Sequence, residues 1–213
     1  MKFQVKKLGL LAALLISTFG FSQVEMSDTR DELKLGFKAG VNFANVYDSQ
    51  GQDFVAEGKA GFAAGAYVAI PIGKFFGIQP EIMYSQKGFK AKGNVLGFTY
   101  DYAKTSTYLD IPVLLQIKPI PVLSIVAGPQ FSYLLDTKNE FNGSSTTTTE
   151  ASINQDNYKK NIFGFAVGAD ISIDHFLISG RAAWDLNKSD VEGNSSAPRY
   201  KNQVVQLTVG YIF

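Results

Sequence analysis

The chain has no cysteine, which excludes disulfide scaffolds and metal sites with thiolate ligands. Charged residues are only 18% of the sequence, and 20 Lys and Arg stand against 19 Asp and Glu. Nucleic-acid binding needs an excess of basic charge, so no nucleic-acid partner is expected. Beyond the N-terminal region no apolar run is long enough for a membrane-spanning helix. Apolar residues nevertheless make up 46%, which is too many for a disordered chain.

The N-terminal segment has the layout of a secretory signal peptide. An uncharged apolar run, Leu8–Phe21, follows three lysines, Lys2, Lys6 and Lys7. A helix that crosses about 30 Å of hydrocarbon needs about 20 apolar residues, so this run is short for a permanent anchor. Residues 1–22 are therefore predicted to be a cleaved signal peptide, and a retained anchor is the alternative.

Period-two alternation of apolar and polar residues runs through the rest of the chain. In the last segment Leu207, Val209, Tyr211 and Phe213 alternate with polar or small residues. Such alternation places one set of side chains on each face of a β-strand. Eight strands are predicted, at residues 35–43, 61–70, 76–85, 109–118, 123–133, 163–172, 176–185 and 203–213.

In each predicted strand one face is uniformly apolar, while the other mixes glycine, serine, glutamine and charge. This favours an all-β, eight-stranded antiparallel up-and-down transmembrane barrel over a soluble barrel with an apolar interior. Long and short connections alternate, as in bacterial outer-membrane barrels, whose short turns are periplasmic. The expected loops are residues 47–59, 87–103, 136–160 and 187–200, and the expected tight turns are 71–74, 119–121 and 174–175.

This pattern predicts the domain organisation and the location. Residues 23–32 are expected to form a periplasmic lead-in, and residues 33–213 the barrel domain. The protein is expected in the cell outer membrane with its N- and C-termini periplasmic. The run of small and polar residues 143–149 has nothing apolar to bury and is expected to lack fixed structure.

Several segments resemble the PorT-type outer-membrane β-barrel proteins of Bacteroidota. They are Tyr108-Leu109-Asp110-Ile111-Pro112-Val113-Leu114-Leu115, the Gly128-Pro129 step and Pro80-Glu81-Ile82-Met83-Tyr84. The resemblance implies the barrel fold and the outer-membrane location, and for some relatives a role in protein secretion. The C-terminal stretch is similar to the signal read by the barrel-assembly machinery, with Gly210, Tyr211 and the terminal aromatic Phe213 as candidate residues.

The alternation directs a set of charged side chains into the lumen: Lys38, Glu81, Asp110, Asp170, Arg181 and Asp185. Unpaired charges in a confined interior are costly, so these residues are expected to pair with one another or with trapped water. Arg181 is expected to bond with Asp110, Asp170 or Glu81. The network is interpreted as a plug that closes the barrel, and passage of protons or small solutes is the alternative.

Little in the sequence indicates catalysis or a cofactor. The one histidine, His175, falls in a predicted tight turn, and no Gly-x-Ser-x-Gly nucleophile motif occurs. Asp185, Asp190 and Glu192 could hold calcium weakly, but they lack the regular spacing of a calcium loop. No enzyme activity, cofactor or resident metal is therefore expected.

The functional prediction is a structural or surface-interaction role exerted through the external loops. The expected partners are outer-membrane lipids, the barrel-assembly machinery during biogenesis, and an extracellular or secretion-machine partner. An accessory role in outer-membrane protein secretion and a small-solute channel are the alternatives.

Overall fold

The computed structural model describes residues 28–48, 56–95, 98–143, 146–151, 161–187 and 200–213. The predicted signal peptide lies outside these ranges. The regular elements are nine strands: β1 (Lys34–Asp48), β2 (Ala56–Ile72), β3 (Phe76–Val95), β4 (Phe98–Ile120), β5 (Leu123–Gly143), β6 (Thr146–Ala151), β7 (Asn161–Ile173), β8 (Phe176–Asp185) and β9 (Tyr200–Ile212). Within the described ranges no helix is long and apolar enough to cross a membrane.

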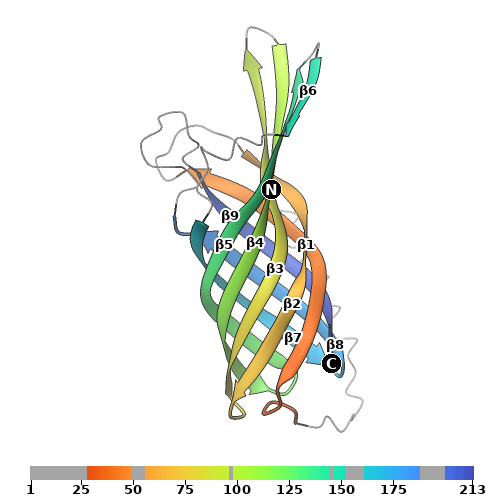
Figure 1. Cartoon of the computed structure of the whole chain (residues 1–213), viewed down its shortest axis with the longest axis vertical. Coiled ribbons are helices and arrows are strands. Elements are labelled where there is room, and N and C mark those ends of the chain that lie inside the picture. Colours follow the sequence, from red (N-terminus) through yellow and green to blue (C-terminus); the bar gives the residue numbers. More distant parts are fainter. Residues whose placement is uncertain (1–27, 49–55, 96–97, 144–145, 152–160, 188–199) are drawn as a thin grey trace, which may run out of the picture.

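Eight of the nine strands close into one antiparallel barrel (Figure 1). Neighbours in the chain pair with each other, β5 pairs directly with β7, and β1 pairs with β9 to complete the ring. The predicted fold class, an eight-stranded up-and-down barrel, is confirmed. Closure pairs the backbone groups of every barrel strand on both sides, which is what a sheet in hydrocarbon requires.

Within the described ranges, much of two predicted loops, 87–103 and 136–160, is strand instead. β3 and β4 stay paired from Lys87 opposite Ser106 to Val95 opposite Phe98, so residues 87–95 and 98–103 belong to one long antiparallel pair. β5 continues to Gly143 and pairs with β6, a ninth strand that the alternation did not reveal. The prediction failed because the backbone ladder continues beyond the point where the outward row stops being apolar.

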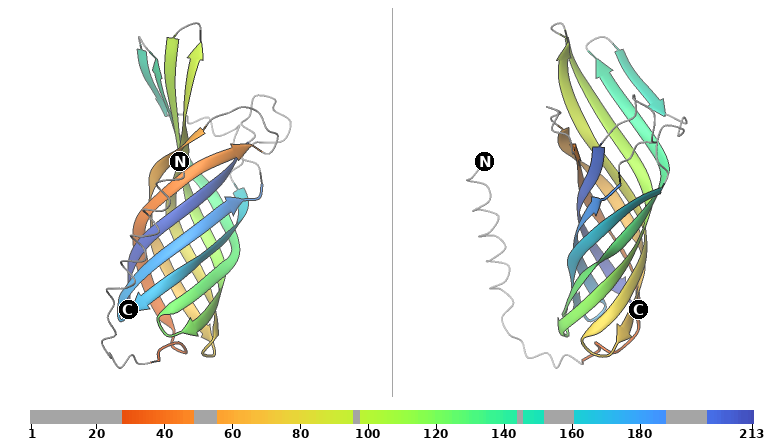
Figure 2. Two further views of the ribbon diagram at one scale, coloured as in Figure 1. Left: turned by 180° about the vertical axis from the view of Figure 1, so that it is seen from behind. Right: turned by 90° about the vertical axis from the view of Figure 1, so that its left-hand side faces the viewer.

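We call the part of this sheet beyond the barrel rim the blade. It comprises residues 90–95 of β3, 98–103 of β4, 138–143 of β5, and β6, and it projects from one end of the barrel (Figures 1 and 2). The threonine run 146–149, expected to lack structure, forms most of β6. Threonine is β-branched and is enriched in strands.

The barrel is inverted relative to a water-soluble protein. The barrel strands carry exposed apolar side chains on the outer face, such as Val205, Leu207 and Val209 of β9, whereas the interior holds many polar and charged residues beside a few apolar ones such as Leu114 and Val126. Aromatic side chains are exposed at both ends of this apolar belt: Tyr84, Tyr133 and Trp184 toward the blade, and Phe76, Phe176, Tyr211 and Phe213 toward the tight turns. Aromatic girdles at both interfaces are typical of transmembrane barrels.

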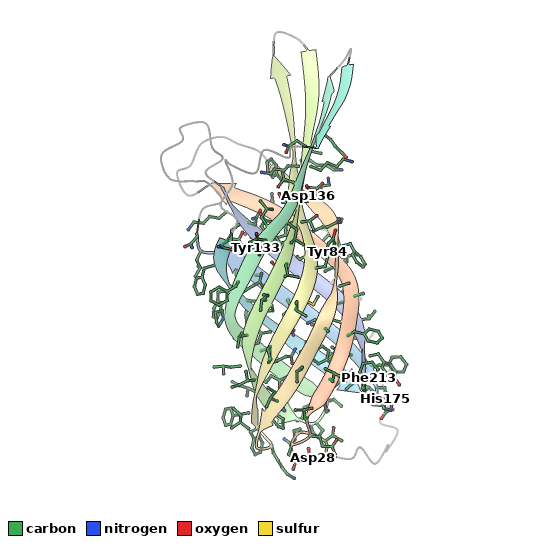
Figure 3. The ribbon with its side chains drawn as sticks, viewed as in Figure 1. Asp28, Tyr84, Tyr133, Asp136, His175 and Phe213 are labelled. Carbon is green, nitrogen blue, oxygen red and sulfur yellow. The ribbon has the colours of Figure 1, made fainter. Side chains whose placement is uncertain are left out.

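The two ends of the barrel differ in their connections. The tight turns carry the backbone positions with positive φ, Gly73 (72°) and Asp174 (50°). Asp28, His175 and Phe213 lie at this end, and Asp136 lies toward the blade (Figure 3). We call the first the turn end and the second the blade end.

Candidate functional site

All six charged residues assigned to the lumen are buried, with exposed fractions from 1% for Lys38 to 8% for Arg181. They come from five different strands, β1, β3, β4, β7 and β8. Their side chains, together with buried amides and hydroxyls, form two clusters stacked along the lumen.

The lower cluster is centred on Arg181. Its guanidinium forms a two-pronged ion pair with Asp170, with Nη1 2.6 Å from Oδ1 and Nη2 2.9 Å from Oδ2. Nη2 also donates to Glu81 Oε1 at 3.2 Å. The planar fork of a guanidinium matches a carboxylate in this geometry, and such charge-assisted pairs are among the stronger hydrogen bonds.

Lys38 and two glutamines complete the lower cluster. Lys38 Nζ lies 2.8 Å from both carboxylate oxygens of Glu81. Gln79 Nε2 donates to Glu81 Oε1 at 2.7 Å and to Asp170 Oδ2 at 3.2 Å, and Gln116 Nε2 donates to Gln79 Oε1. Two cations and two carboxylates therefore balance in a network that crosses the lumen.

The upper cluster is built around Lys87. Its Nζ donates to Asp110 Oδ1 at 2.9 Å and to Ser132 Oγ at 3.2 Å, and it lies 4.8 Å from the centre of the Tyr108 ring. Asn202 Nδ2 donates to Asp185 Oδ2 at 2.6 Å. The structure thus pairs Arg181 with Asp170 and Glu81, two of its three expected partners, and pairs Asp110 with Lys87.

Lys87 is a buried member of these clusters that the sequence reasoning missed, because it fell in an expected loop. A signal was present: Lys87 continues at period two the inward row of Glu81, Met83 and Ser85. The register places it opposite Ser106 on a continuous ladder.

The clusters leave little space in the lumen. A cavity of about 20 Å³ lies between them, bordered by Glu81, Lys87, Asp110 and Arg181. A second of about 30 Å³ lies below the lower cluster, near Tyr67 and Ser124. One water molecule needs roughly 10–15 Å³, so each cavity has room for only a few waters at most.

The weaker sequence candidates lie elsewhere. His175 occupies the β7–β8 turn, where Nδ1 is 2.8 Å from the Ile212 carbonyl oxygen and the ring stacks on Tyr211. No group of three or more potential metal-ligating side chains occurs in the described residues. Asp185 lies in the upper cluster, whereas Asp190 and Glu192 fall outside the described ranges.

The C-terminal residues are anchored at the turn end (Figure 3). The Phe213 amide donates to the Leu35 carbonyl at 2.9 Å, while its side chain is 68% exposed on the outer face. Its ring lies 5.7 Å from that of Phe37 and 5.6 Å from that of Tyr211. Gly210 faces Lys38, and a β-carbon there would come within 2.5 Å of the Phe37 carbonyl oxygen.

Comparison with protein families matches residues 21–191 to the outer membrane protein β-barrel domain. Among solved structures, Ail of Yersinia pestis is 13% identical, with a TM-score of 0.48 over 85% of this chain and 99% of that chain. Neisserial surface protein A is 9% identical, with a TM-score of 0.49 over 84% and 97%. A major outer membrane protein of Thermus thermophilus is 15% identical, with a TM-score of 0.43 over 85% and 100%. No curated protein matches the chain.

Proposed function

Since the chain belongs to the outer membrane protein β-barrel domain family, we propose that this outer-membrane barrel is a closed, non-conducting scaffold that presents the blade at the cell surface. Its specific role is structural or surface interaction, and catalysis is not part of it. Export would depend on residues 1–22 as a cleaved signal peptide.

The observation that carries the proposal is the pairing of charges across the lumen. Arg181, Asp170, Glu81 and Lys38 form one continuous network through side chains that are each at most 6% exposed. An ion that enters a narrow barrel must lose its hydration and break such contacts, which costs several kcal/mol per buried charge. Eight strands enclose a space that side chains can fill, so the barrel is a support rather than a pore.

The connections support an orientation with both termini in the periplasm. In bacterial outer-membrane barrels the short turns face the periplasm and the longer segments face outward. The turn end holds Asp28 and Phe213, near the two ends of the described chain (Figure 3). The blade then projects outward from the cell.

Planar-bilayer recording tests closure. The purified protein should give no steady single-channel openings, and regular openings would favour the small-solute channel instead. An epitope tag inserted between β3 and β4 should be reached by antibody on intact cells, whereas a tag at Gly73 in the β2–β3 turn should be reached only after permeabilisation. The opposite labelling pattern would overturn the orientation.

The likeness to PorT-type proteins supports a second candidate, an accessory role in outer-membrane protein secretion. Asp110, within the Leu109-Asp110-Ile111-Pro112 segment that carries the likeness, belongs to the upper cluster. A secretion role predicts that deletion of the gene leaves exported cargo in the periplasm. A surface role predicts normal secretion with altered adhesion or envelope integrity, so the secretome of a deletion strain separates the two.

A further inference from the structure

The segment before β1 folds onto the turn end of the barrel. Residues 28–33 precede β1, and a turn closes with the Glu32 amide bonded to the Thr29 carbonyl at 3.2 Å. Asp28 lies at the end of the barrel opposite to Asp136 (Figure 3). The segment therefore lies at the turn end, where it borders a cavity of about 340 Å³ together with Pro121, Ser172 and His175.

Arg30 joins this segment to β4 and to the β2–β3 turn. Its Nη1 donates to the carbonyl oxygens of Lys118 and Pro119, both at 3.4 Å, and its guanidinium carbon lies 5.0 Å from the centre of the Phe75 ring. Lys118 Nζ in turn donates to the Arg30 carbonyl at 2.8 Å. The segment and the barrel therefore each donate hydrogen bonds to the other.

Asp28 fixes the direction of the Arg30 side chain. Nε lies 2.8 Å from Oδ1 and Nη2 lies 2.9 Å from Oδ2, so one edge of the guanidinium is held by the carboxylate. The hydrogen bond from Arg30 holds the pKa of the Asp28 carboxyl well below its usual range. Lys74 adds a weaker contact to Asp28 at 3.4 Å, from a side chain that is 54% exposed.

Directly behind Arg30 lies the lower lumen cavity of about 30 Å³, whose lining includes Arg30 itself, Tyr67, Gln116, Lys118 and Ser124. Tyr67 Oη and Gln116 Oε1 are buried there without a hydrogen-bond partner among the described residues. The cavity is thus polar, and solvent would have a reason to enter it if the mouth opened.

We propose that the segment Asp28–Leu33 is a latch over the lower cavity at the turn end of the lumen, and that Arg30 is the residue that holds it closed. This inference depends on the proposed function in one respect only, the assignment of the turn end to the periplasmic side. The latch is a second closure, separate from the charge clusters above it, because no hydrogen bond or ion pair of Arg30 in the described residues involves Glu81, Asp170 or Arg181.

The absence of cysteine from the chain permits a direct test. Ala69 lines the lower cavity and is only 5% exposed. Ala69→Cys places a thiol there, and N-ethylmaleimide labelling of the folded protein in detergent reports how often the cavity opens. Arg30→Ala should speed this labelling by about tenfold. Arg30→Lys, which keeps the charge but loses the fork, should give an intermediate rate.

Two matched controls define what the latch does. Lys74→Ala removes only the outer contact to Asp28 and should leave the rate at Ala69→Cys within about twofold. A Ser132→Cys reporter in the upper cluster should be unaffected by Arg30→Ala, because the lower cluster lies between them. Equal acceleration at both reporters would mean general loosening of the barrel and would overturn the latch.

Equal Ala69→Cys labelling with and without the Arg30→Ala substitution, in protein of unchanged heat-modifiability, would also overturn it. If Arg30→Ala does not fold, Lys118→Met removes the separate bond from Lys118 Nζ to the Arg30 carbonyl, which holds the same segment, and should also speed the labelling. Arg30→Ala should remain non-conducting in bilayers, since both charge clusters are intact. Conduction by the wild type would instead contradict the proposed function without bearing on the labelling result.

Discussion

Arg181 and Glu81 meet across the lumen, with Nη2 3.2 Å from Oε1, although their strands β8 and β3 are not neighbours in the sheet. Backbone ladders join each strand only to the next one, so this contact ties opposite walls of the barrel. The same guanidinium binds Asp170 on β7, and the same carboxylate binds Lys38 on β1. Four strands are thus linked through two residues.

Arg181→Ala should destabilise the barrel by about 3–5 kcal/mol, because it leaves buried carboxylates without their guanidinium partner. Urea unfolding followed by the fluorescence of Trp184, the one tryptophan, measures the effect. Lys138→Ala is the control, since its ion pair with Glu140 is at the surface, with side chains 50% and 38% exposed. Surface pairs contribute roughly 0–1 kcal/mol, so equal effects of the two substitutions would rule out the structural role of the lumen network.

The sequence was sufficient to predict the barrel and the inward direction of six charged residues, because a period of two fixes the face of every residue once one face is known. It was insufficient to predict which of these charged side chains pair with one another. Asp110 and Asp170 both point inward, yet only strand register decides that Lys87 reaches Asp110 and Arg181 reaches Asp170. The register also contains a shift between Thr107 and Tyr108, which no hydrophobic pattern reports.

The blade escaped prediction for a related reason. Its strands continue the backbone pairing of β3, β4 and β5 without the apolar outer row that marked the membrane-spanning part. β6 pairs with β5 alone and is not part of the closed ring. Its threonine-rich sequence has no apolar alternation that would indicate a strand. The latch could not be predicted either, because it depends on contacts of Arg30 with Lys118 and Pro119, 88 and 89 residues away in sequence. Hydrophobic alternation carries no information about contacts between such distant residues.

Lys104 makes stability at the blade end depend on pH. It lies beyond the Tyr84 and Tyr133 girdle, opposite Phe89 and Asn139, and burial lowers its pKa to about 7. Between pH 7 and the ordinary lysine range near 10.5 the unfolded chain binds this proton more tightly than the folded one, so the stability contributed by this residue rises with pH.

Lys104→Met should therefore raise the urea midpoint more at pH 6.5 than at pH 10, because it removes a buried ammonium that is charged only at the lower pH. Lys138→Met, at an exposed side chain, should change the two midpoints alike. A gain from Lys104→Met that is the same at both pH values would contradict the assigned titration.

Gly40 has a close neighbour across the β1–β9 ladder. A β-carbon added at this position would lie 2.0 Å from the Leu207 carbonyl oxygen and 2.7 Å from Thr208 Cα, both backbone atoms that cannot swing aside. Gly40→Ala should cost roughly 1–3 kcal/mol in urea unfolding. Gly180→Ala is the matched control, since no atom lies within 4 Å of its added β-carbon, and it should be neutral or slightly stabilising. A tolerated Gly40→Ala would show that β1 and β9 can separate without loss.

Phe213 is proposed to act during assembly rather than in the finished barrel. Its side chain is 68% exposed on the outer face, so its removal takes away little buried area, whereas its amide bond to Leu35 survives substitution of the side chain. Phe213→Ala should therefore lower the outer-membrane level several-fold and leave degradation products in the periplasm, while the protein that does insert should unfold at nearly the wild-type urea concentration.

Phe163→Ala, on the same outer face and 5.1 Å from the Phe131 ring, is the control, and it should lose some stability without slowing insertion. Pulse-chase fractionation separates the two, and equal insertion rates for both variants would remove the recognition role from the terminal aromatic.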